Sequence, residues 1–158
     1  MTAVDALTAD GGIVTIRPIT GDDRPALVQL YQDATPESLR LRFFTLPSAT
    51  TIDDEIDRLS RPQGRQHLAL LAEEGGHVVG VASCEHLTED RPKAEFSVFV
   101  AEPHHGRGIA ALLLEHLGVL ARRHGITELV GEVLMGNAGM LRVAHDLSRH
   151  SWSHIDQA

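Results

Sequence analysis

The sequence has few cysteines, few aromatic residues and no long apolar run, and each shortage excludes a class of protein. Its 158 residues include one cysteine, one tryptophan, one tyrosine and four phenylalanines. A single cysteine, Cys84, forms neither an intrachain disulfide nor a thiolate metal cluster. No apolar run approaches the roughly 20 residues of a membrane span. The first residues, MTAVDALTADGG, lack the basic start and apolar core of a signal peptide. We therefore expect a cytoplasmic protein.

Positive charge is also scarce. Asp and Glu number 22 against 14 Lys and Arg, which gives a net charge of −8. Nucleic-acid-binding proteins normally present a basic face, so the predicted partners include neither nucleic acid nor membrane. What remains is an ordinary globular composition, with 42% hydrophobic and 23% charged residues, at a length that suits a single domain.

The spacing of apolar residues predicts three helices, an antiparallel meander, and then alternating helices and strands. The first strand covers 13–17 and ends at Pro18. Helices follow over 22–32, 36–44 and 51–61, the last one with a capping box formed by Thr51 and Asp54. The remaining predictions are strands 67–72, 77–84 and 93–101, a helix over 109–124, a strand over 128–135 and a last helix over 137–147.

The stretch HHGRGIAALLLEHL, residues 104–117, leads from the third meander strand through a glycine loop into a helix. The first turn of a helix has free N–H groups that attract anions, and glycines let a phosphate approach the backbone. A pyrophosphate-bearing cofactor is therefore expected. The GxGxxG/A pattern also fits a nicotinamide site, with Glu128 about 20 residues further on. However, that fold joins parallel strands through helices, whereas tight turns join the strands here.

The run VFVAEPHHGRGIAALLLEHL resembles the coenzyme-A loop of the GNAT superfamily of N-acetyltransferases. The family pattern Gln/Arg-x-x-Gly-x-Gly/Ala falls on residues 105–110, where Gly108 and Ala110 fit and His105 departs. The order of elements agrees from Val14 to Leu147. Two further segments, ATPESLRLRFF and GEVLMGNAGMLRVAHDL, are similar to bacterial protein-lysine acetyltransferases. The resemblance implies an α/β (α+β) fold, with a mixed, mostly antiparallel sheet flanked by helices.

The resemblance also implies the activity and the cofactor contacts. An acetyl group is expected to pass from acetyl-CoA to a primary amine of a protein lysine. The alternatives are a small-molecule amine as acceptor, or a catalytically weak acyl-CoA-binding module. No metal is expected. The implied cofactor-binding residues are Val98, Phe99, Val100, His105, Gly106, Arg107, Gly108, Ile109, Ala110 and Asn137.

Glu95 is the predicted general base, because similar acetyltransferases place a glutamate early on the strand that leads to the loop. Glu85 is the reserve candidate. Cys84 does not suggest a nucleophile, so direct transfer is favoured over an acyl-enzyme. Many relatives carry a tyrosine seven residues after the asparagine that corresponds to Asn137, and here that position is Ala144. The thiolate is therefore expected to take its proton from water, or the activity is low.

The two ends of the chain are expected to lie outside the acetyltransferase domain. Residues 1–12 are predicted to be flexible, 13–147 to form the domain, and 148–158 to be a short atypical tail. The last two strands of the family are expected to be missing. Their loss exposes the edge of strand 128–135, so we expect a second copy of the chain to cover it in a homodimer.

Overall fold

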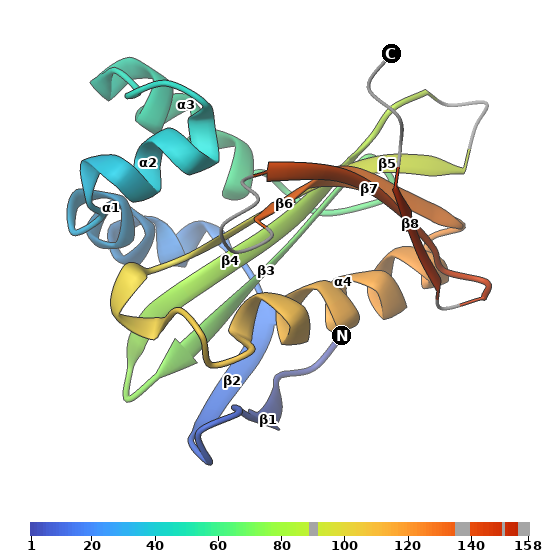
Figure 1. Cartoon of the computed structure of the whole chain (residues 1–158), viewed down its shortest axis with the longest axis horizontal. Helices are drawn as coiled ribbons and strands as arrows, with labels where there is room; N and C mark the ends of the chain where they lie inside the picture. The colour runs from blue at the N-terminus through green and yellow to red at the C-terminus, as the bar shows by residue number, and fades with distance from the viewer. Residues whose placement is uncertain (89–91, 135–139, 150, 155–158) are drawn as a thin grey trace.

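The computed structural model describes residues 1–88, 92–134, 140–149 and 151–154. Within these residues one sheet has eight strands, and their order in the sheet is their order in the chain (Figure 1). All neighbouring strands are antiparallel except β5 and β6, which run parallel. The strands are β1 (Val4–Leu7), β2 (Ile13–Pro18), β3 (His67–Glu74), β4 (His77–His86), β5 (Lys93–Val100), β6 (Glu128–Leu134), β7 (Met140–Asp146) and β8 (Ser151–His154).

Helices cover both faces of the sheet. On one face lie α1 (Arg24–Gln32), α2 (Pro36–Phe43) and α3 (Ala49–Leu59), and on the other lies α4 (Ile109–Arg123) (Figure 1). Successive strand residues point to opposite faces, and β3 follows this rule. Leu68 and Leu70 belong to the core under α4, whereas Ala69 and Leu71 belong to the core under α1–α3. The mixed α/β fold class predicted from the sequence is confirmed.

The starts of α2 and α3 show how local sequence sets the helix boundaries. Thr35 accepts a hydrogen bond from the Ser38 N–H at the start of α2. Ser48 accepts one from the Thr51 N–H at the start of α3. Thr51 was predicted to be the cap, so the helix begins three residues earlier than expected. A hydroxyl in an extended residue satisfies an N–H that the helix leaves free, and Ser48 meets that condition.

The predicted last helix is wrong in its described part, which forms strand β7. Its apolar residues include Leu141, Val143 and Leu147, and they fit a helical period nearly as well as an alternating one. The edge of β6 favours the strand over the helix. Pairing with β7 joins the backbone of β6 over seven residue pairs, from Glu128 with Asp146 onward, and an open edge would leave those groups without partners.

The prediction of missing C-terminal strands is therefore also wrong, because β7 and β8 are present. The edge that a second copy of the chain was expected to cover is covered by the chain itself, which removes the reason for predicting a homodimer. Strand β8 pairs with β7, and Trp152 stacks on His145 with ring centroids 4.1 Å apart.

The amino-terminal segment also differs from expectation. It was predicted to be flexible, but it contains β1, which pairs with β2 over four residues. The sheet thus extends into both end segments. No helix in the described ranges is both long enough and apolar enough to cross a membrane.

Candidate active site

Strands β5 and β6 pair only at their beginnings and then diverge. Their register joins Lys93 with Glu128, Ala94 with Leu129 and Glu95 with Val130, and no later pair joins the described parts of the two strands. The Ala101 N–H donates to the Val79 carbonyl of β4 over 2.9 Å. Backbone groups alternate along a strand, so those of Val98 and Val100 point away from β4 and toward the gap.

A cavity of about 1460 Å³ runs through this gap. Its walls include side chains from both faces of β5. Ser97 and Phe99 face α1–α3, whereas Phe96 and Val98 face α4. The cavity therefore connects the two faces of the sheet at the point where the strands separate.

The glycine loop and the start of α4 form the wall of the cavity on the α4 face. Gly106 has a φ of 78° and Gly108 a φ of 80°, values that favour glycine. Gly108 is the N-cap and no side chain of the described residues caps the helix there. Ile109, Ala110 and Ala111 line the cavity at the first helical turn. Their N–H groups precede the first intrahelical bonds, so this end of α4 can bind an anion.

His105 sits between the loop and β5. Its Nε2 lies 2.6 Å from the carbonyl oxygen of Val100, and the residue lines the cavity. The departure from the family pattern at this position thus replaces a longer side chain with an imidazole that contacts the backbone of β5.

Arg107 is the loop residue that the structure does not bring into the cavity. Its guanidinium forms a two-pronged ion pair with Glu74, at 2.6 and 3.0 Å, and its Nε donates to Asp10 over 2.7 Å. Only 15% of its side chain is exposed. Arg107 was among the predicted cofactor-binding residues, but its guanidinium is directed to Glu74 and Asp10 instead.

Glu95 lies at the last residue pair before the strands separate, and its side chain is 54% exposed. Its Oε2 is 3.6 Å from Nη2 of Arg142 on β7. The carboxylate therefore stands at the mouth of the cavity, open to solvent and next to one cation. Sequence reasoning missed Arg142, because the segment that carries it was predicted to be a helix.

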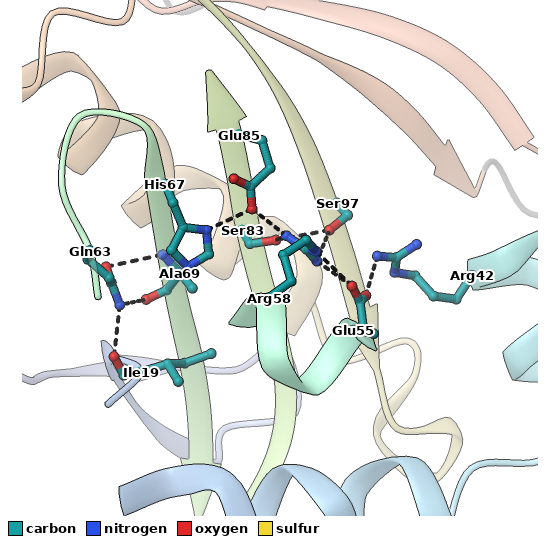
Figure 2. A network of polar contacts seen from close by, with 10 residues as sticks. All are labelled: Ile19, Arg42, Glu55, Arg58, Gln63, His67, Ala69, Ser83, Glu85 and Ser97. Atoms are coloured by element: carbon teal, nitrogen blue, oxygen red, sulfur yellow. Dashed lines mark hydrogen bonds and ion pairs between the residues drawn. The ribbon is translucent and has the colours of Figure 1, made fainter. Parts of the chain in front are cut away.

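Glu85 is directly opposite Glu95 on β4, but its carboxylate is already engaged (Figure 2). Its Oε1 contacts Nδ1 of His67 at 2.7 Å and accepts from Nη1 of Arg58 at 2.8 Å. Burial works to raise the pKa of the Glu85 carboxyl, but the hydrogen bonds from His67 and Arg58 outweigh it and leave the pKa below its usual value. A carboxylate held in this way is a weaker proton acceptor than a free one.

Arg58 links Glu85 to further polar side chains on the face of the sheet that α1–α3 cover (Figure 2). It donates to Ser83 over 2.8 Å and pairs with the buried Glu55, which also binds Arg42. Tyr31 is hydrogen-bonded to Glu55, and its ring stacks on that of Phe99 with the ring centroids 5.1 Å apart. Burial, with the charge of Glu55, raises the pKa of Tyr31 far above its usual value. Tyr31 is therefore not available as a proton donor to a leaving thiolate.

Cys84 is buried and does not line the cavity. Burial, with the charge of Glu85, raises the pKa of its thiol to about 12, so it is not a nucleophile near neutral pH. Asn137 lies outside the described residues. Within the described ranges no three His, Cys, Asp or Glu side chains gather as metal ligands do.

Gly131 is a further site residue that sequence reasoning missed. It follows the last β6 residue paired with β5, and an added Cβ would lie 2.7 Å from the Phe96 carbonyl oxygen and 2.8 Å from its ring. The signal in the sequence is a glycine inside a predicted strand, which often marks a close approach of another backbone. Gly131 and Phe96 together shape the point where β6 leaves β5.

A sheet opened between two parallel strands, with a glycine loop and helix start on one side, defines an acyl-CoA-dependent transferase fold of the GNAT type, and comparisons with known proteins agree. The sequence profile of the acetyltransferase (GNAT) family matches residues 24–147. An L-methionine sulfoximine/L-methionine sulfone acetyltransferase of Salmonella typhimurium is 31% identical over 140 residues, which are 85% of this chain and 78% of the relative.

Solved structures point the same way. The GNAT domain of S. lividans PAT superposes with a TM-score of 0.79 at 28% identity, over 91% of this chain and 96% of that one. A putative acetyltransferase from Salmonella typhimurium, solved with acetyl-CoA, superposes with a TM-score of 0.59 at 27% identity, over 79% and 72% of the two chains. The chain belongs to the acetyltransferase (GNAT) family, and it is an acetyl-CoA-dependent N-acetyltransferase.

Proposed function

We propose that this enzyme transfers an acetyl group directly from acetyl-CoA to the primary amine of a protein lysine in the cytoplasm. The observation that carries the proposal is the cavity through the gap between β5 and β6. It joins an anion-binding helix start on one face of the sheet to the exposed carboxylate of Glu95 on the other. A donor entering from the α4 face and an acceptor entering from the opposite face meet in this gap.

The binding role of each donor-side residue follows from its position. The N–H groups of Ile109 and Ala110, with the glycines of the loop, bind the pyrophosphate. The β5 segment from Val98 to Val100 binds the pantetheine arm, because the backbone N–H and C=O groups of Val98 and Val100 point into the gap. An N–H there also stabilises the charge that develops on the thioester oxygen.

The chemistry requires a neutral amine, since a lysine ammonium has a pKa of about 10.4 and is not a nucleophile. Glu95 accepts the proton, directly or through a water, as the amine nitrogen attacks the thioester carbonyl carbon. The C–S bond then breaks and an amide forms. The coenzyme-A thiolate leaves and takes its proton from water, because Tyr31 is buried and Ala144 has no proton to give.

A protein acceptor is favoured by the open mouth around Glu95. Glu85 and Glu95 are cross-strand neighbours there, with 32% and 54% of their side chains exposed. Glu85 is paired with Arg58 and His67, so Glu95 is the carboxylate that attracts an extended cationic side chain such as lysine at this accessible mouth. The second candidate acceptor is the amine of a small amino acid, which the identity of 31% to the methionine sulfoximine acetyltransferase supports. The third is no acceptor at all, in a weakly catalytic acyl-CoA-binding module.

The experiment measures release of coenzyme A with two acceptors, a lysine-containing peptide and L-methionine sulfone. Glu95→Gln is compared with Asp54→Asn, which removes the same charge from an exposed position of α3 outside the cavity. We expect kcat with the peptide to fall by about 100-fold or more in Glu95→Gln. Acetyl-CoA affinity stays the same, and Asp54→Asn behaves as the wild type.

Each other outcome selects a different account. Turnover of methionine sulfone but not of the peptide would establish the small-molecule acceptor. Binding of acetyl-CoA with no turnover of either acceptor would favour the binding module. Equal activity of Glu95→Gln and Asp54→Asn would refute the role of Glu95 as general base.

A further inference from the structure

Arg107 connects the glycine loop to the end of β3 and to the segment between β1 and β2. Besides its ion pairs with Glu74 and Asp10, its Nη2 donates to Thr8 Oγ1 over 3.4 Å. Its Nη1 lies 2.9 Å from Nδ1 of His104. Glu74 ends β3, and Thr8 and Asp10 lie between β1 and β2. One guanidinium thus joins the loop to segments far away in the sequence.

The backbone at this point is joined as well. The Ala9 N–H donates to the carbonyl oxygen of Arg107 over 2.8 Å. Gly12 makes room for the guanidinium, because an added Cβ there would lie 2.6 Å from Nη2 of Arg107. The contacting segment, residues 8–12, precedes the part of the chain that matches the family profile, which begins at residue 24. The Asp10 side of this connection is therefore supplied by the amino-terminal hairpin formed by β1 and β2.

The loop needs an external support because its own residues supply little. Gly106 and Gly108 carry no side chain, and each adopts a backbone conformation that glycine reaches among many others. An anion site made of N–H groups works only when those groups converge on one point. His105 contacts the Val100 carbonyl oxygen at one end of the loop, and Arg107, placed between the two glycines, is the side chain whose contacts can hold the middle of the loop.

We propose that Arg107 and Asp10 are positioning residues, which hold the loop of residues 105–110 in the shape that binds the pyrophosphate of acetyl-CoA. The proposal rests on the proposed placement of the cofactor at the start of α4. Arg107 does not touch the phosphates. It acts through the backbone of its glycine neighbours, while Asp10, Glu74 and Thr8 fix its side chain.

The charge state of the partners agrees with this role. A hydrogen bond from Thr8, and after it one from Arg107, lowers the pKa of Asp10 to about 2. Hydrogen bonding to Arg107 lowers the pKa of Glu74 as well. Both carboxylates are therefore ionised at neutral pH, and the guanidinium faces two negative charges. A cation neutralised in this way contributes little direct attraction to a phosphate.

The test compares Asp10→Asn with Asp5→Asn. Asp5 lies on β1 of the same hairpin and accepts a hydrogen bond from Thr15, away from the loop. Each variant is assayed with acetyl-CoA and with S-acetylpantetheine, which has the same thioester but no pyrophosphate. Binding of coenzyme A is measured by calorimetry in parallel, so that the result does not depend on knowing the acceptor.

We expect Asp10→Asn to raise the KM for acetyl-CoA and the Kd for coenzyme A by about five- to ten-fold, with kcat unchanged. Glu74→Gln and Arg107→Lys, which remove the two-pronged pair by other means, act in the same direction. The kcat/KM for S-acetylpantetheine stays the same in all of them, and Asp5→Asn matches the wild type throughout.

Three results would overturn the proposal. If Asp10→Asn binds coenzyme A as the wild type does, the connection does not position the loop. If both thioesters lose activity equally, the variant damages the fold in general. If Asp10→Asn binds coenzyme A more tightly, the freed Arg107 is a direct phosphate ligand. Failure of the wild type itself to bind coenzyme A is a separate outcome, and it refutes the proposed cofactor site.

Discussion

Gly131 provides a sharp test of the gap between β5 and β6, because the structure leaves no room for a side chain there. A methyl group at this position would lie 2.7 Å from the Phe96 carbonyl oxygen and 2.8 Å from two atoms of the Phe96 ring. Contacts this short to a backbone oxygen cannot be relieved by turning one side chain, so Gly131→Ala must move β6 or β5 itself. Overpacking of a well-packed site costs about 1–3 kcal/mol.

We therefore predict that Gly131→Ala lowers the melting temperature by roughly 2–12 °C, since about 1 kcal/mol corresponds to roughly 2–4 °C in a chain of this size. Its KM for acetyl-CoA rises as well, because Gly131 and Phe96 line the cavity. The matched control is Gly21→Ala, where an added Cβ meets no atom within 4 Å. Calorimetric melting and steady-state kinetics provide the two measurements. If the two variants melt together and bind acetyl-CoA equally, the close approach at the gap is not what shapes the site.

Two further predictions concern buried groups on the α1–α3 side of the sheet. Glu55→Ala leaves the cations of Arg42 and Arg58 without their shared buried carboxylate; we expect a loss of about 3–5 kcal/mol in urea unfolding, and a loss no larger than that of the exposed Asp54→Ala would contradict it. Burial raises the pKa of Cys84 to about 12, so at pH 8 only about one thiol in 10,000 is ionised. A disulfide reagent should label Cys84 in urea but not in the folded protein, with a native rate that rises with pH; complete labelling of folded protein within minutes at pH 8 would contradict its burial.

Much of the fold can be predicted from the sequence because its elements have one clear period. Strands β3 and β4 are apolar runs of strand length on either side of a Gly75–Gly76 turn, β5 alternates in part, and α4 carries leucines at helical spacing. Strand β7 could not be predicted, because its apolar residues fit two periods and the open edge of β6 decided between them. Strand β1 has only four residues, too few to show a period.

The candidate site also has one part that the sequence predicts and one part that it does not. The glycine loop is a local motif, and the structure brings its residues other than Arg107 into the cavity together with the β5 segment and Glu95. The direction of the Arg107 side chain depends on Asp10, which lies 97 positions away. The engagement of Glu85 depends on Arg58 and His67, which come from α3 and β3. Such contacts form only when distant elements pack, so no local pattern indicates them.

The central claim is that the donor crosses the sheet between β5 and β6 and meets the acceptor beside Glu95. A crystal structure with coenzyme A and a lysine peptide tests it most directly. We predict pyrophosphate oxygens on the N–H groups of Ile109 and Ala110, the pantetheine arm along Val98–Val100, and the lysine nitrogen between the sulfur and the Glu95 carboxylate. Coenzyme A bound elsewhere, or a lysine that enters from the α4 face, would contradict the account.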